Sequence, residues 1–179
     1  MIEYEGNKLE DFVGEYLELY KKKETDKDAL EKALNDCLQQ VVSLNPGDIP
    51  DNIVNNILKT LMGKKFIGDS AIGLPMLSGL LSMKLPEHFA VIDYRVLEAI
   101  YKLRTKDFFP QDVKSYILKK WQNMRYANGQ IKKITAKDYI NYLRVIKGFK
   151  NRIIEGASAR AFPLSDIDRA LYAYHKYGK

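Results

Sequence analysis

The sequence predicts an all-α protein, a single helical domain over residues 1–179 with about seven or eight helices. Three observations support this fold class. Apolar residues recur every three or four positions, and only a helix brings such positions onto one face. Clusters of Pro and Gly separate these segments as turns. No alternating apolar run is long enough to build a sheet.

Length, charge and cysteine content limit the functional classes. The 179 residues suffice to bury a sizeable core, and 29 Lys and Arg against 23 Asp and Glu give a net charge of +6. That charge is compatible with nucleic-acid binding, and the surplus of basic residues builds after Lys59. The single cysteine, Cys37, excludes a disulfide framework and a structural zinc site. We therefore expect no metal and no cofactor.

The N-terminal residues and the apolar runs indicate a location. The first five residues include two glutamates and lack the basic and apolar parts of a secretion signal. No apolar run approaches the roughly 20 residues that a membrane span requires. We expect a cytoplasmic protein without a membrane partner. No pattern in the sequence indicates an oligomeric state.

Three helices are predicted in the first third of the chain. The first spans residues 7–23, and its three final lysines suit the C-terminal end of the helix dipole. The second begins at Asp26 and repeats apolar pairs every four residues. The third begins with Asp51 as its cap and ends near Met62, where Gly63 supplies a left-handed stop.

A turn and a further helix follow. Ser70 is a residue type that caps helices, and Gly73 permits a tight turn of the backbone. The next helix is expected over residues 74–84, and Pro86 prevents it from continuing.

An apolar run then leads to an isolated acid. Residues 89–92 are too apolar and too β-branched for a solvated loop, so we expect them to cross the core in extended form. They deliver Asp93 to the start of the next helix, where Asp is a favoured N-cap residue.

The remaining helices are predicted in the last third of the chain. One spans residues 112–126, in which Trp121 lies near several basic residues, as suits stacking on an unpaired base, and also on an apolar face, as suits the core. Thr135 caps the longest helix, over residues 136–157, and Ser165 opens the last one.

Residues 51–104 resemble the helix-hairpin-helix DNA glycosylases of base-excision repair. That family shares a helix, a Gly-rich hairpin, a second helix and an extended run into an Asp. Its hairpin usually reads Leu-Pro-Gly-Val-Gly, where this chain has Asp69-Ser-Ala-Ile-Gly73, so the second glycine is kept. Gly73 and Asp93 stand twenty positions apart, as in the family.

The closest likeness is to small uncharacterised proteins of that type. They share this glycine, the phrase Val-Ile-Asp-Tyr-Arg, here residues 91–95, and a C-terminal helix of the type Asp-Arg-Ala-Leu-Tyr, here residues 168–172. The resemblance covers much of the chain.

The resemblance implies a function in DNA repair. Asp93 corresponds to the acid that assists water in cleaving the bond between base and sugar. The lysine of the lyase-type enzymes would fall near Pro75. Lys84 is the only nearby substitute, and its position at a helix end predicts exposure to solvent. An active protein would therefore be a monofunctional N-glycosylase. His88 and Tyr94, together with Trp121, are candidate pocket residues.

The expected partner is DNA. In hairpin-type DNA-binding proteins the backbone at the start of the second helix holds a phosphate. The corresponding DNA-binding residues here are Lys64, Lys65, Gly68, Ser70 and Gly73.

Two alternatives to an active glycosylase remain open. The chain is a catalytically inert nucleic-acid-binding module, in which Asp93 serves as a cap alone, or it is a helical adaptor without a nucleic-acid role.

His88 follows Pro86 and Glu87 on a connection that resembles a surface turn, where a histidine is usually neither ligand nor base.

Overall fold

The structure is a computed structural model that describes residues 27–44, 49–64, 72–103, 134–156 and 162–178. These ranges hold six helices and no strand, which confirms the all-α class. The helices are α2 (Lys27–Val42), α3 (Asp51–Leu61), α4 (Leu74–Lys84), α5 (Tyr94–Leu103), α7 (Ala136–Gly156) and α8 (Leu164–Tyr177). The helices predicted over residues 7–23 and 112–126 lie outside the described residues.

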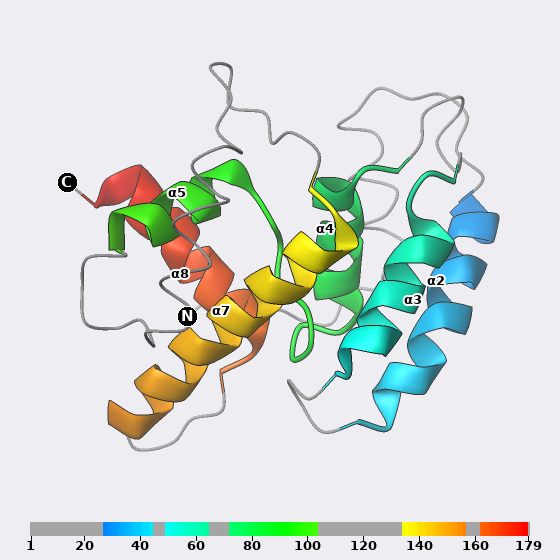
Figure 1. Cartoon of the computed structure of the whole chain (residues 1–179), viewed down its shortest axis with the longest axis horizontal. Coiled ribbons are helices and arrows are strands. Elements are labelled where there is room, and N and C mark those ends of the chain that lie inside the picture. The colour runs from blue at the N-terminus through cyan, green and yellow to red at the C-terminus, as the bar shows by residue number, and fades with distance from the viewer. Residues whose placement is uncertain (1–26, 45–48, 65–71, 104–133, 157–161, 179) are drawn as a thin grey trace.

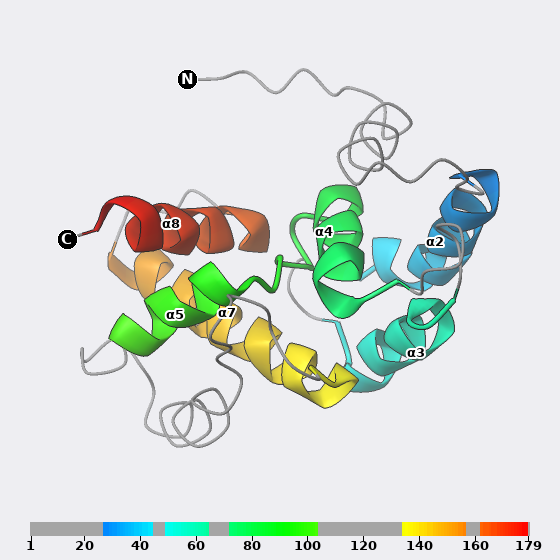
Figure 2. The ribbon, with the colours of Figure 1, turned by 90° about the horizontal axis from the view of Figure 1, so that it is seen from above.

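The longest of these helices, α7, connects two groups of shorter helices. Figures 1 and 2 show α2 and α3 together on one side of the molecule and α5 and α8 together on the other. Helix α7 packs against α3 and also against α8, while α4 lies between the two groups. The connection from α4 to α5 therefore passes through the centre of the molecule.

One hydrophobic cluster joins all six helices. Most of the helices contribute a stripe of buried residues at helical spacing, as the sequence predicts, whereas the central helix α4 is buried on nearly all sides over residues 77–82. The fully buried side chains include two tyrosines of α7, Tyr139 and Tyr142. A buried tyrosine needs a partner for its hydroxyl group. Both partners lie on the connection between α4 and α5.

The helix ends agree only in part with the predicted caps. Gly63 has a φ of 81° after α3, which confirms the left-handed stop. Thr135 and Asp138 form a reciprocal capping box at the start of α7, in which each backbone N–H donates to the side-chain oxygen of the other residue. Asp51 is not the cap of α3, because Pro50 occupies that position and Asp51 is already the first helical residue.

The end of α3 and the start of α4 are joined by backbone hydrogen bonds. The Gly63 N–H donates to the Ile72 carbonyl at 3.3 Å, and the Ile72 N–H donates to the Lys64 carbonyl at 3.1 Å. Gly73 is the N-cap of α4 with a φ of −83° and a ψ of 160°, an extended conformation that any residue adopts. The tight turn predicted at Gly73 is therefore wrong. Residues 65–71, the rest of the predicted hairpin, lie outside the described residues.

Within the described ranges, no helix has both the length and the apolar character that crossing a membrane would demand.

Candidate functional site

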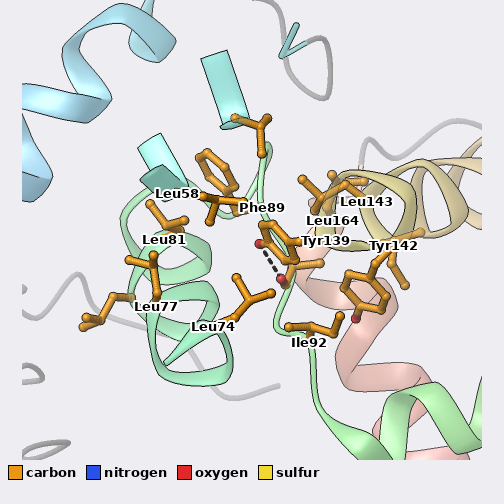
Figure 3. Close-up of a cluster of buried hydrophobic side chains, with 14 of the residues drawn as sticks. Leu58, Leu74, Leu77, Leu81, Phe89, Ile92, Tyr139, Tyr142, Leu143 and Leu164 are labelled. Atoms are coloured by element: carbon orange, nitrogen blue, oxygen red, sulfur yellow. Dashed lines mark hydrogen bonds between the residues drawn. The ribbon is translucent and has the colours of Figure 1, made fainter. Parts of the chain in front are cut away.

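The connection between α4 and α5 is an extended segment that crosses the core. Phe89, Ala90 and Ile92 are buried, which confirms the prediction for residues 89–92. Figure 3 shows the segment between the leucines of α4 and the tyrosines of α7. Because an extended segment makes no hydrogen bonds of its own, its buried polar groups need partners from the surrounding helices.

Two tyrosines of α7 satisfy two carbonyl groups of the segment. The Tyr139 hydroxyl donates to the Ala90 carbonyl at 2.8 Å, marked by the dashed line in Figure 3, and the Tyr142 hydroxyl donates to the Val91 carbonyl at 2.6 Å. The two rings are stacked, with centroids 6.1 Å apart. Burial raises the pKa of both hydroxyl groups well above the ordinary tyrosine value, so both remain donors.

Helices α8 and α4 satisfy two N–H groups of the same segment. The carboxylate of Asp168 accepts a hydrogen bond from the Val91 N–H, and the Ser78 hydroxyl accepts one from the Ile92 N–H at 3.1 Å. Asp168 is only 3% exposed. Burial raises the pKa of its carboxyl group to about 7, although the hydrogen bond from Val91 opposes that rise.

Sequence reasoning missed the role of Asp168. The residue lies near the start of a predicted helix, where an acid is ordinary. One signal was present: Asp168 follows Leu164 by four positions and precedes Leu171 by three, so it shares their buried face. An acid on an apolar face needs a hydrogen-bond donor, and the Val91 N–H supplies it.

Asp93 follows the extended segment and caps α5. Its Oδ1 atom accepts a hydrogen bond from the Arg95 N–H at 2.7 Å, and its carbonyl accepts the Leu97 N–H at 3.0 Å. These contacts confirm the predicted N-cap. The Oδ2 atom lies 3.8 Å from Nη1 of Arg95, and 31% of the Asp93 side chain is exposed. One carboxylate oxygen is therefore committed to the helix, and the other contacts a guanidinium group at the surface.

Aromatic side chains from α5 and α8 surround Arg95. Its guanidinium carbon lies 4.8 Å from the ring centroid of Tyr94 and 5.4 Å from that of Tyr172. Tyr94 also makes an edge contact with His175, with centroids 6.3 Å apart, and Nδ1 of His175 lies 3.5 Å from a carboxylate oxygen of Glu98. Helix α8 thus brings aromatic and ionisable groups to the start of α5.

The structure separates the predicted pocket residues. His88 is 6% exposed, so the expectation of a surface histidine is wrong: the turn before it packs against α8, whose Ser165 N–H donates to the Pro86 carbonyl at 3.2 Å. His88 lines a pocket of about 300 Å³ between α3 and α7, and neither Tyr94 nor Asp93 lines that pocket. Trp121 lies outside the described residues.

Two of the predicted DNA-binding residues lie at the described ends of the connection from α3 to α4. Lys64 and Gly73 are both exposed, and both adjoin the backbone pairing with Ile72. The remaining three, Lys65, Gly68 and Ser70, lie outside the described residues.

The substitute lysine considered for lyase chemistry has a structural partner. The Lys84 ammonium group lies 3.8 Å from a carboxylate oxygen of Glu31 on α2, and 21% of the Lys84 side chain is exposed. Lys84 is the last residue of α4, but it is half-buried against α2, so the expected exposure to solvent is wrong.

Metal-ligating residues do not gather anywhere in the part of the chain that the structure describes: it holds no group of three or more His, Cys, Asp or Glu side chains arranged to bind an ion. The chain matches no family model, no curated protein and no solved structure.

Proposed function

We propose that this protein binds DNA and excises a base with the Asp93 carboxylate, as an N-glycosylase without a lyase step. The observation that carries the proposal is the different use of the two carboxylate oxygens of Asp93, a partly exposed side chain: Oδ1 holds the cap of α5, and Oδ2 lies 3.8 Å from Nη1 of Arg95. The order of elements supports it: a helix, a connection, a second helix, an extended run and an acid at a helix start.

The chemistry requires one carboxylate in a fixed position. Cleavage breaks the bond between the base nitrogen and the sugar carbon, the base leaves with the bond's electron pair, and water adds to the sugar carbon. A carboxylate beside that carbon stabilises the developing positive charge and accepts a proton from the water. In this proposal Oδ2 of Asp93 performs both tasks, while the hydrogen bond to the Arg95 N–H fixes the carboxylate rotamer.

The surroundings of the extended segment suit this role. Catalytic groups are effective when packing and hydrogen bonds hold them within a fraction of an ångström. Tyr139, Tyr142 and Asp168 each bond the backbone of the segment immediately before Asp93. They are positioning residues in the proposed site.

The proposed DNA-binding face consists of Lys64, Lys65 and the backbone around Gly73. Lys64 and Gly73 are exposed and lie on either side of the Ile72 pairing, so a phosphate there would meet positive charge and accessible backbone. The net charge of +6 agrees with such binding.

Duplex binding at increasing salt tests this face. Binding through phosphates releases counterions, so the affinity should fall steeply with salt concentration. A double variant with Lys64→Ala and Lys65→Ala should bind several-fold more weakly at low salt. A double variant with Lys32→Ala and Lys137→Ala, two exposed lysines on α2 and α7, removes the same charge and should bind like the parent. Equal affinities for all three proteins would show that the proposed face is wrong.

The ion pair between Asp93 and Arg95 favours a second candidate, in which the chain binds DNA without cleaving it. The Arg95 guanidinium group lies 3.8 Å from Oδ2 of Asp93, the oxygen that catalysis would use. The positive charge of Arg95 offsets part of the negative charge on that oxygen. An inert module would bind DNA with the same salt dependence and leave every damaged base in place.

A further inference from the structure

A second candidate site lies away from Asp93, in the pocket of about 300 Å³ that His88 lines. Four parts of the fold form it: the start of α3, the middle of α7, the turn before the extended segment and the first residue of α8. Most of its wall is apolar and is contributed by Ile49, Pro50, Val54, Ile140, Leu143 and Leu164. A volume of this size lies at the lower end of the range for small-molecule sites, about 300 to 1,000 Å³.

Apart from His88, the polar side chains of the pocket are charged and lie mainly on one helix. Arg144 and Lys147 are three positions apart on α7, so they share a face. Asp51 is the acid among the lining residues, and it forms an ion pair with Nη2 of Arg144. The lining therefore carries two cations and one carboxylate. This excess of positive charge favours an anionic ligand over a neutral or cationic one.

The ion pair between Arg144 and Asp51 does not close the pocket. Their side chains are 60% and 54% exposed, and exposed ion pairs contribute little to stability, about 0 to 1 kcal/mol. Nη1 of Arg144 also donates to the Asn141 side chain at 3.2 Å, which keeps the guanidinium group over the same turn of α7. A ligand carboxylate or phosphate can compete with Asp51 for this group, because a planar guanidinium group binds either anion through paired hydrogen bonds.

We propose that this pocket binds a small organic anion. Its apolar body lies against Val54, Leu143 and Leu164, and its carboxylate or phosphate group binds Arg144 and Lys147. The volume accommodates about ten non-hydrogen atoms, at the roughly 30 Å³ that one water molecule occupies in the liquid. This site is independent of the proposed function, since neither Asp93 nor the connection from α3 to α4 contributes to it.

Three probes that share a phenyl ring test the proposal on the full chain: benzoate, phenyl phosphate and the neutral benzyl alcohol. Methyl chemical shifts of Leu143 and Leu164 report binding. Both anions should shift these methyl groups, and the tighter of the two identifies the preferred head group. Benzyl alcohol should bind about tenfold more weakly than that anion, the factor expected when one hydrogen bond to a charged group is lost.

Variants assign the charge preference to the two cations. The double variant with Arg144→Gln and Lys147→Gln should weaken anion binding about tenfold, to the level of benzyl alcohol. A control with Lys137→Gln and Arg152→Gln removes two exposed cations from the same helix and should bind both anions like the parent. If the double variant fails to fold, the comparison of charged and neutral probes on the parent still decides. Equal binding of all three probes, unchanged binding by the double variant, or no shift of these methyl groups would overturn the proposal.

Discussion

The carboxylate of Asp168 accepts a hydrogen bond from the backbone N–H of Val91, although the two residues are 77 positions apart in the chain. The contact joins α8 to the extended segment that ends at Asp93. The two phrases that carried the likeness to small glycosylase-type proteins, residues 91–95 and 168–172, thus meet in space. The contact gives both phrases a structural role in this chain that does not depend on any activity.

Removing the Asp168 carboxylate should destabilise the fold. In Asp168→Ala the buried Val91 N–H loses its acceptor, at an expected cost of about 1 to 3 kcal/mol in the free energy of unfolding. Asp168→Asn keeps an acceptor oxygen and should cost less. Asp166→Asn on the same helix changes an exposed ion pair with Arg169 and should have little effect. Urea unfolding of the three variants near pH 4, where the buried carboxyl group of the parent is protonated, measures the order, and a neutral Asp168→Ala at that pH would contradict it.

The stability contribution of Asp168 should also depend on pH. Its pKa is raised to about 7 in the folded chain, above the value of about 3.9 in an unfolded chain, so the folded state holds a proton that the unfolded state releases. Between pH 4 and 7 the free energy of unfolding should therefore fall as pH rises, by up to about 4 kcal/mol from this group.

The measurement is the difference in the free energy of unfolding between the parent and Asp168→Asn, taken across that pH range. The Asn variant cannot titrate at this position, so the difference isolates Asp168. The free energy of unfolding of the parent should fall relative to that of Asp168→Asn as the pH rises. A difference that stays constant, or that grows with pH, would show that the buried carboxyl group is not protonated in the folded chain below pH 7.

The two buried hydroxyl groups of α7 should each contribute to stability. Tyr139→Phe and Tyr142→Phe keep the stacked rings but leave the Ala90 or Val91 carbonyl without its tyrosine donor. Each should lower the free energy of unfolding by about 1 to 3 kcal/mol. Tyr174→Phe, which alters a tyrosine that is 40% exposed, is the matched control and should be nearly neutral. If both variants lose no more free energy of unfolding than the control, these hydrogen bonds do not hold the segment.

The cap at Asp93 should be separable from any catalytic role. Asp93→Ala removes the acceptor for the Arg95 N–H and should cost about 1 kcal/mol, whereas Asn caps a helix about as well as Asp. Thermal unfolding of the two variants checks this order. If Asp93→Asn destabilises as much as Asp93→Ala, the Asn side chain does not replace the cap, and the variant could not serve as a folded, inactive control.

Local features of the fold were predictable from the sequence, because they depend on residues close together in the chain. The extended run through Phe89, the cap at Asp93 and the stop at Gly63 each follow from the chemistry of neighbouring residues. The burial of His88 and the hydrogen bond from Val91 to Asp168 could not be predicted in this way. Both depend on where α8 packs, which no local pattern specifies.

The pocket beside α7 was unpredictable for the same reason. Arg144 and Lys147 share a helix face that the sequence reveals, but Asp51 and His88 reach them from parts of the chain more than 50 positions away. Helical periodicity identifies which face is buried and not which helix covers it. Pocket residues that come from separate elements could therefore be identified only from the structure.

The proposed glycosylase activity is tested by measuring excision from a panel of duplexes, each carrying one damaged base. Parent protein and Asp93→Asn are compared, with alkaline strand cleavage reporting abasic sites and duplex binding measured in parallel. We expect the parent to excise at least one base, and Asp93→Asn to bind DNA equally well and to excise none. Excision that persists in Asp93→Asn would remove this carboxylate from the mechanism. A parent that binds DNA but excises no base would contradict the glycosylase assignment and establish the inert binding module.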